Sequence, residues 1–410
     1  MSPLELSVRA AGARVIAALA GRYRDLDIAE EAFAEACARA AKAWARAGTP
    51  GDPAAWLYRV AERAALDELR KRRVRQRLAP EPEEPAEMDE PSPVPDERLR
   101  LIFVCCHPAV APDARAALTL RLVCGLSNAE IARAFLLPEP TLAQRLVRAK
   151  RKIAEAGVPF EVPGPERWAE RLDAVLSTLE VAYAKAHEDA AGTGPHAGYG
   201  PEMIGLTGLL AELLPCEPEV LALAALVWFA EARRPARVRV DGAMVPLSEQ
   251  DPALWRQDLI EDGAALLARA RRLGDGQARL LQAQLHALWC ARRSLAEPPP
   301  WVAVLALYDR MLAVRDDPVV RLNRIVALGE AYGVSPALAE LEALDDARLA
   351  GFLPFQAVRA GLLNRAGRME EAKLAYDAAL ALEPGSAERM WLERRRAELT
   401  PSLPICANPG

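Results

Sequence analysis

Lysine and arginine side chains cluster on one short stretch of this chain, between residues 141 and 153. From Arg115 to Lys152 there are eight lysines or arginines and only two glutamates, although the whole chain has a net charge of −5. DNA binding needs such a local surplus, because each neutralised phosphate releases condensed counterions. The stretch therefore predicts a defined DNA-binding surface, while the acidic balance of the whole chain argues against general binding to polyanions.

The residues around this stretch predict a helix-turn-helix. Ser127 is a favourable N-cap, and Glu130 completes a capping box for a short helix over Asn128–Phe135. After a turn, a second helix over Thr141–Ile153 would bury a face formed by Leu142, Leu146, Ala149 and Ile153. Two short helices joined by a tight turn, the second strongly basic, are typical of a motif that reads the major groove. The alternative is an ordinary helical hairpin whose charges are only solvated.

Two helices of opposite charge are expected nearer the N-terminus. The range Asp25–Trp44 has apolar residues at helical spacing and acidic side chains on its outer face. The next helix follows Asp52, carries Trp56 in an apolar stripe, and bears eight basic side chains up to Arg77. The acidic helix predicts a surface for a basic protein partner, and the basic helix predicts a surface for nucleic acid.

Other residues with reactive side chains do not form a convincing catalytic site. The chain has no glycine-rich phosphate loop, and its four histidines form no constellation, so neither an enzyme activity nor a cofactor is expected. Cys105, Cys106 and His107 invite a metal site, but three adjacent residues on a helix point in different directions. We therefore expect a buried helix that ends near Pro108 rather than a metal or redox site.

The composition indicates a cytoplasmic protein without a membrane partner. The seven cysteines are scattered and form no C-x-x-C pair, which is typical of reduced thiols. The longest apolar run, Val220–Ala230, has 11 residues. A membrane span needs about 20 residues, so this run is expected to be a core helix.

The fold is expected to be all-α, because strand patterns are nearly absent outside a hairpin-like run near residues 236–247. The range Pro80–Glu97 contains six prolines, eight carboxylates and no basic residue, which predicts an extended linker. The range Gln356–Pro384 has the spacing of one tetratricopeptide repeat, and neighbouring helices must cover its apolar face. We expect an N-terminal domain (1–78), a linker (79–96), a helix-turn-helix domain (97–157), a helical connecting region (158–300), helical repeats (301–400) and a tail (401–410).

These motifs together resemble a known protein family. The range Asp27–Trp44, with D-P-A-A-W-L-Y-R-V-A and L-D-E-L-R-K-R-R after it, resembles region 2 of bacterial extracytoplasmic-function sigma factors. The range Leu126–Ile153 resembles their region 4. The segment Asp96–Val110 and the long helical tail are similar to the subgroup with a tetratricopeptide-like C-terminal extension.

The resemblance implies two partners, core RNA polymerase and promoter DNA, and assigns residues to each. The acidic face expected to dock on the polymerase consists of Asp27, Glu30, Glu31 and Glu35. The residues expected to bind the promoter −10 element are Asp52, Trp56, Arg59, Arg63 and Arg70. Those expected at the −35 element are Thr141, Gln144, Arg145, Arg148, Lys150 and Arg151. Among the latter, Gln144 and Arg148 would read bases, whereas Arg145, Lys150 and Arg151 would lie nearer phosphates.

The same resemblance implies that the C-terminal helices control the activity. We hypothesise that they either mask the DNA-binding faces or add a polymerase contact. The concave repeat surface is expected to bind a protein partner, and the alternative is a purely structural cap.

One alternative to a sigma factor is a one-component regulator, in which the helix-turn-helix is coupled to a repeat-built sensor and binds duplex operators unaided. A second is a scaffold whose repeats carry the function. The acidic and basic helices over 27–77 separate a sigma factor from the one-component regulator, which does not require them. Charge reversal of Arg145 and Arg148 separates a sigma factor from the scaffold, whose function would survive it.

Overall fold

The computed structural model describes residues 3–75, 97–135, 137–188, 199–275, 277–344, 349 and 351–399. Within these ranges the regular structure is helical apart from one isolated β-bridge, so the expected all-α fold is confirmed. The acidic linker expected at 79–96 and the tail at 401–410 lie outside the described residues. Short 3-10 turns at Pro165–Arg167, Arg234–Ala236, Leu247–Glu249 and Pro252–Leu254 connect several of the helices.

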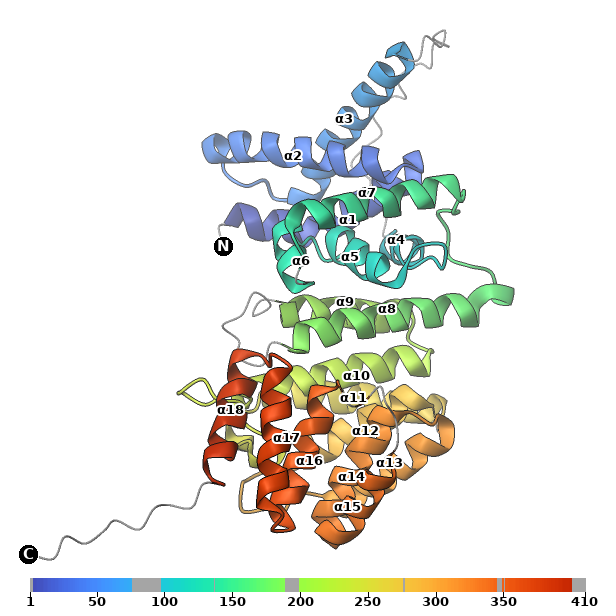
Figure 1. Cartoon of the computed structure of the whole chain (residues 1–410). Helices are drawn as coiled ribbons and strands as arrows, with labels where there is room; N and C mark the ends of the chain where they lie inside the picture. Colours follow the sequence, from blue (N-terminus) through green and yellow to red (C-terminus); the bar gives the residue numbers. More distant parts are fainter. Residues whose placement is uncertain are drawn as a thin grey trace, which may run out of the picture. The chain divides into compact units, whose positions relative to one another are not determined.

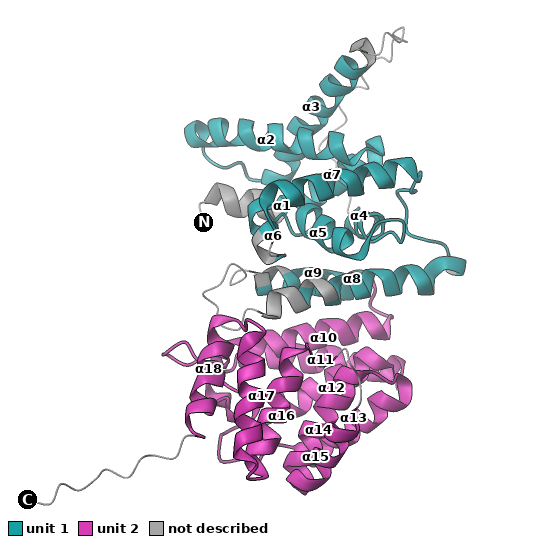
Figure 2. Cartoon of the chain, in the orientation of Figure 1, with its two compact units in different colours: residues 1–186, 198–213 teal, residues 187–197, 214–410 magenta. Residues whose placement is uncertain are grey.

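The chain divides into two compact units (Figure 2). The first contains residues 1–186 and 198–213, and the second contains residues 187–197 and 214–410. Helices α8 (Trp168–Glu188) and α9 (Tyr199–Leu213) therefore fall almost entirely in the first unit, although both belong to the expected connecting region. The division into six segments stays a prediction.

The first three helices of the first unit pack on one another: α1 (Pro3–Tyr23), α2 (Leu26–Ala47) and α3 (Pro53–Arg75) (Figure 1). Helix α2 begins where the Asp25 carboxylate accepts hydrogen bonds from the backbone N–H groups of Asp27 and Ile28, at 2.9 and 3.0 Å. Such a cap satisfies two donors that have no partner inside the helix. The apolar stripe of α2 is buried as expected, at Ile28, Ala32, Ala36, Ala40 and Trp44.

The helix-turn-helix is present. Helices α4 (Arg98–Cys105) and α5 (Pro112–Leu122) contact α1, and α5 also contacts both α6 (Asn128–Ala134) and α7 (Glu139–Glu155). The predicted capping box forms: Glu130 accepts from the Ser127 N–H at 2.7 Å, and the Glu130 N–H donates to the Ser127 hydroxyl at 3.2 Å. The predicted face of α7 is buried at Leu142, Leu146, Ala149 and Ile153.

Helix α8 packs against α4 within the first unit. Arg171 of α8 donates a 2.6 Å hydrogen bond to the backbone carbonyl of Phe103. The rings of Phe103 and Trp168 lie 5.5 Å apart. These contacts place α8 against the core that supports the helix-turn-helix.

The second unit is a succession of helices in which most contact the next along the chain. They are α10 (Pro218–Ala232), α11 (Gln257–Leu273), α12 (Ala278–Cys290), α13 (Trp301–Val314), α14 (Pro318–Tyr332), α15 (Val334–Ala343), α16 (Leu353–Arg365), α17 (Met369–Ala381) and α18 (Ser386–Ala397). The apolar run Val220–Ala230 lies in α10 and is mostly buried, as expected of a core helix. Across the described residues, no helix is long and apolar enough to cross a membrane.

The predicted repeat corresponds to the pair α16 and α17. Gly367 joins them with a φ of +75°, a backbone conformation that glycine adopts without steric cost. Ala360, Ala372, Tyr376 and Ala379, which carry the repeat spacing, share one buried cluster with Leu392 of α18. This helix pair therefore covers its apolar face with the following helix, and its assignment as a tetratricopeptide repeat stays a prediction.

The hairpin expected near residues 236–247 is present as one antiparallel bridge between Val238 and Met244. Gly242 turns the chain with a φ of +89°. The backbone N–H of Met244 donates to the carbonyl of Ala387 at 3.0 Å, and Asp241 pairs with Arg394 at 2.8 Å. The turn is thus fixed to α18 rather than extended into a sheet.

Candidate nucleic-acid interface

All six side chains expected at the −35 element lie on α7. Thr141, Gln144, Arg148 and Arg151 are exposed. Arg148 lies one turn after Gln144 and donates to its carboxamide oxygen at 3.5 Å, so the two side chains share one face. Arg145 is half-buried and lies 3.8 Å from Asp113.

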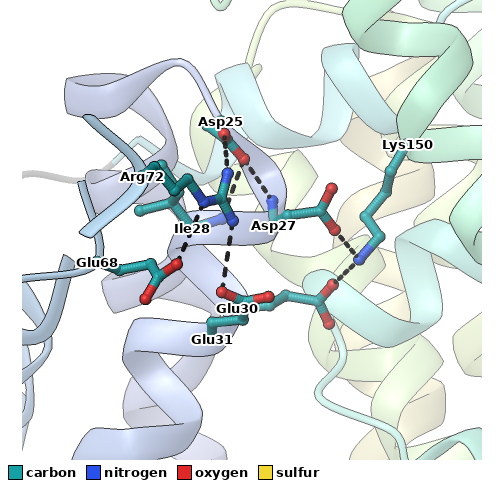
Figure 3. A network of polar contacts seen from close by, with 8 residues as sticks. All are labelled: Asp25, Asp27, Ile28, Glu30, Glu31, Glu68, Arg72 and Lys150. Atoms are coloured by element: carbon teal, nitrogen blue, oxygen red, sulfur yellow. Dashed lines mark hydrogen bonds and ion pairs between the residues drawn. The ribbon is translucent and has the colours of Figure 1, made fainter. Parts of the chain in front are cut away.

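Lys150 points toward α2 instead of solvent (Figure 3). Its ammonium lies 2.5 Å from Asp27 and 2.8 Å from Glu30, and only 14% of its side chain is exposed. Burial disfavours its charge, but the two carboxylates outweigh that cost, so the pKa of Lys150 is raised above its ordinary value. The sequence placed Lys150 near DNA phosphates, whereas here it binds residues expected to contact the polymerase.

A second cation of the helix-turn-helix domain reaches the same carboxylate. Arg121 of α5 donates to Glu30 at 3.1 Å and to the backbone carbonyl of Leu126 at 3.0 Å. Glu30 is only 16% exposed. We call the contacts of Lys150 and Arg121 with Asp27 and Glu30 the α2–α7 clamp.

The rest of the acidic face is also paired within the chain. Glu31 lies 3.4 Å from Arg72 of α3, and Glu35 lies 2.8 Å from Arg39, one turn further along α2. Arg72 also binds the capping residue Asp25 at 3.1 Å (Figure 3). A hollow of about 290 Å³ lies between side chains of α2 and α3. The charged residues that line it are Glu31, Glu35, Arg39, Asp67, Glu68 and Lys71. Glu31 and Glu35 are exposed, so this hollow presents carboxylates to a partner.

The residues expected at the −10 element occupy the start and one side of α3. Asp52 accepts from the backbone N–H of Ala55 at 2.9 Å and so satisfies a donor in the first turn. Trp56 is half-buried, and its ring meets that of Trp44 edge-on at 5.4 Å. Arg59, Arg63 and Arg70 are exposed. Arg59 follows Trp56 by three residues, Arg63 follows Arg59 by four, and Arg70 follows Arg63 by seven. This helical spacing places the arginines on the same side of α3 as the indole.

Sequence reasoning missed three residues that organise this surface. Asp25 could have been found, because an aspartate directly before an amphipathic helix is a standard N-cap signal. Arg72 was counted among the basic residues of its helix, but its pairing with Glu31 depends on how α2 and α3 cross. The contact of Arg121 with Glu30 joins residues 91 positions apart, and no local pattern predicts it.

Cys105, Cys106 and His107 lie at the end of α4, as the sequence predicted. Both cysteines are buried, which raises the pKa of each thiol, and the Cys106 sulfur lies 3.4 Å from the Thr119 hydroxyl. His107 Nδ1 accepts a 3.1 Å hydrogen bond from the Ala109 N–H. Burial and the nearby charges of Arg171 and Arg115 lower the pKa of His107. Over the described ranges, no group of three or more histidine, cysteine or acidic residues is placed to hold a metal ion.

Comparison with known proteins agrees with this geometry. Residues 8–75 match the model of sigma-70 region 2, and residues 100–153 match that of sigma-70 region 4. Two regions of this kind, carried on the helices described above, define a transcription factor that acts at promoters. The chain belongs to the sigma-70 family. Core RNA polymerase and promoter DNA are the partners that these two regions indicate.

The match extends beyond the two sigma regions. Residues 171–271 match a family of unknown function. An uncharacterized protein of Rhizobium meliloti (strain 1021) is 38% identical over 412 residues and covers 96% of each chain. No solved structure matches the chain.

Proposed function

We propose that this chain is an extracytoplasmic-function sigma factor that binds core RNA polymerase and directs it to a restricted set of promoters. The observation that carries the proposal is the presence of both sigma-70 regions, each with an exposed basic helix. Asp27, Glu30, Glu31 and Glu35 of α2 are the polymerase-docking side chains. A one-component regulator would not require this acidic helix next to a second basic one.

The DNA contacts follow from which side chains are exposed. Trp56 and the three arginines on its side of α3 contact an opened −10 element, where an aromatic ring can stack on an unpaired base. Gln144 and Arg148 read bases at the −35 element, because their paired side chains stand on the exposed face of α7. Arg151 and Arg145 contact phosphates.

We expect the α2–α7 clamp to open when the polymerase binds. Asp27 holds Lys150, and Glu30 holds both Lys150 and Arg121, so polymerase cations compete with these partners for the two carboxylates. The 25 base pairs between −35 and −10 also span about 85 Å at 3.4 Å each. The chain between Arg75 and Arg98 can extend to about 80 Å, so its length permits a separation of this order.

The helical second unit acts as a built-in regulator with tetratricopeptide-like repeats. The pair α16–α17 supports this proposal, because its small buried residues have the repeat spacing. A chain truncated after Leu213 keeps α8, which Arg171 binds to α4. Promoter output from this variant rises if the second unit masks the DNA-binding faces, and it falls if that unit adds a polymerase contact. Unchanged output would refute both forms of regulation.

The test of the whole proposal is complex formation with purified core RNA polymerase. We expect the full chain to co-elute with core enzyme in gel filtration at low ionic strength. Glu35→Lys should weaken the complex, whereas Glu155→Lys, a charge reversal at the exposed end of α7, should leave it intact. If the unmodified chain does not co-elute with core RNA polymerase, the proposal is wrong.

A further inference from the structure

A hollow of about 470 Å³ opens among the helices of the second unit. Its walls come from α12, α13, α14, α16, α17 and α18, with the turn at Leu247–Glu249 closing one side. Sites for small molecules usually enclose about 300–1,000 Å³. The hollow is therefore large enough for a molecule of two to four fused rings.

Five aromatic side chains line this hollow. Trp289 and Trp301 meet edge-on, with ring centroids 4.9 Å apart. Tyr308 lies on the same helix as Trp301, and Tyr376 and Trp391 add rings from α17 and α18. Such walls favour a flat apolar ligand, because rings pack with offset-stacked or edge-on geometry.

The charged residues at the hollow neutralise each other. Arg395 pairs with Glu249 at 2.8 Å and lies 5.7 Å from the centroid of the Trp391 ring. Arg365 pairs with Glu330 at 2.6 Å. Because both arginines already have carboxylate partners, they do not offer a free cation to a phosphate or a peptide carboxylate.

Polar groups in the walls could bind an uncharged acceptor. Asn323 and Asn364 line the hollow, and their carboxamide N–H groups can donate to a carbonyl or hydroxyl oxygen. Asn364 is half-buried, whereas Asn323 is exposed. Burial raises the pKa of Tyr308 to about 12, so its phenol stays neutral.

We propose that this hollow binds an uncharged aromatic small molecule that carries a carbonyl or hydroxyl oxygen. The rings occupy the aromatic walls, and the oxygen accepts a hydrogen bond from the carboxamide of Asn364. The second unit is then a ligand sensor as well as a helical repeat. An apolar peptide is the rival occupant, and the experiment below separates the two.

The experiment uses two dyes that differ in charge: N-phenyl-1-naphthylamine is neutral, and its 8-sulfonate is anionic. We expect the full chain to bind the neutral dye and to bind the sulfonate at least about tenfold more weakly. Gly361 lines the hollow, and a Cβ built on it meets no atom within 4 Å. Gly361→Phe should therefore fill the hollow and abolish dye binding, while the matched control Gly361→Ala should retain it.

A third dye tests the hydrogen bond. Nile red is neutral and carries a carbonyl, so Asn364→Leu should weaken its binding about fivefold and leave N-phenyl-1-naphthylamine binding unchanged. Equal binding of the sulfonate, or dye binding that survives Gly361→Phe, would overturn the proposal. The proposal would also be overturned if apolar peptides displaced the dyes while no uncharged aromatic compound from a screening library did. None of these measurements needs polymerase. Their failure can therefore be distinguished from failure of the proposed sigma-factor function.

Discussion

Arg148 and Arg151 lie one turn apart on α7 and are expected to act differently on DNA. Arg148 stands beside Gln144, whereas Arg151 is held by Glu155 at 2.6 Å near the end of the helix. A base-reading arginine discriminates by about 1–3 kcal/mol against the wrong base pair. A phosphate-binding residue contributes equally on every sequence.

We therefore predict that Arg148→Ala lowers affinity by about 10- to 100-fold and relaxes selectivity at one base pair of the −35 element. Arg151→Ala should weaken all promoters alike and reduce the slope of log K against log salt by about 0.9. The measurement is a titration of variant promoters with the complex of chain and core polymerase, at several salt concentrations. Identical effects of the two substitutions would contradict the assignment.

His107 should make the first unit sensitive to acid. Burial, Arg171 and Arg115 lower its pKa in the folded chain, so the unfolded chain takes up the proton more readily. The free energy of unfolding should therefore fall as the pH drops below about 6.5, the ordinary value for histidine. In His107→Asn, which keeps an acceptor for the Ala109 N–H, that contribution should vanish. Denaturant titrations of the unmodified chain and of the variant, from pH 7.5 to 5, would measure this contribution. If the two free energies of unfolding depended on pH in the same way, His107 would not be the cause.

At the level of helices, the α2–α7 clamp holds two expected binding surfaces against each other. The pair of Lys150 with Asp27 is partly exposed, whereas the pair of Lys150 with Glu30 is mostly buried and costs more to break than a surface pair. A partner that opens the clamp must therefore supply cations that replace Lys150 at Glu30. The strength of the clamp should decline as salt rises, because the Debye length shortens to about 8 Å at physiological ionic strength.

We predict that Lys150→Met raises the affinity for core polymerase about threefold to fivefold in the absence of DNA, because opening costs less. Lys152→Met is the matched control: Lys152 is exposed two residues further along the same helix, and its loss should leave the affinity unchanged. Fluorescence anisotropy with labelled core enzyme would measure both. An unchanged or lower affinity of the Lys150 variant would refute the clamp while leaving polymerase binding itself intact.

The helices themselves were predictable because their signals are local. The Ser127–Glu130 capping box and the buried face of α7 depend on residues three or four positions apart. The partner of Lys150 was not predictable, because Glu30 lies 120 positions away and only the packing of the helices brings the two together. The aromatic hollow was missed for the same reason, since its walls are drawn from residues 246 to 395.

Across the whole chain, three proposed activities are distributed over the two units. The first unit carries the acidic face proposed to bind the polymerase and both basic helices, and the second carries the hollow proposed to bind a ligand. The sequence predicted DNA-binding elements from charge and periodicity, which are properties of single helices. It could not predict what the second unit recognises, because recognition there depends on side chains from many helices.

The most direct test of the central claim is transcription in vitro with purified core RNA polymerase on a randomised promoter library. We expect the chain to direct initiation from a small set of templates sharing one −35 and one −10 sequence. Replacing Gln144 and Arg148 should change the selected −35 sequence without changing the −10 sequence. Transcripts that start at random, or no stimulation of the core enzyme at all, would contradict the central claim.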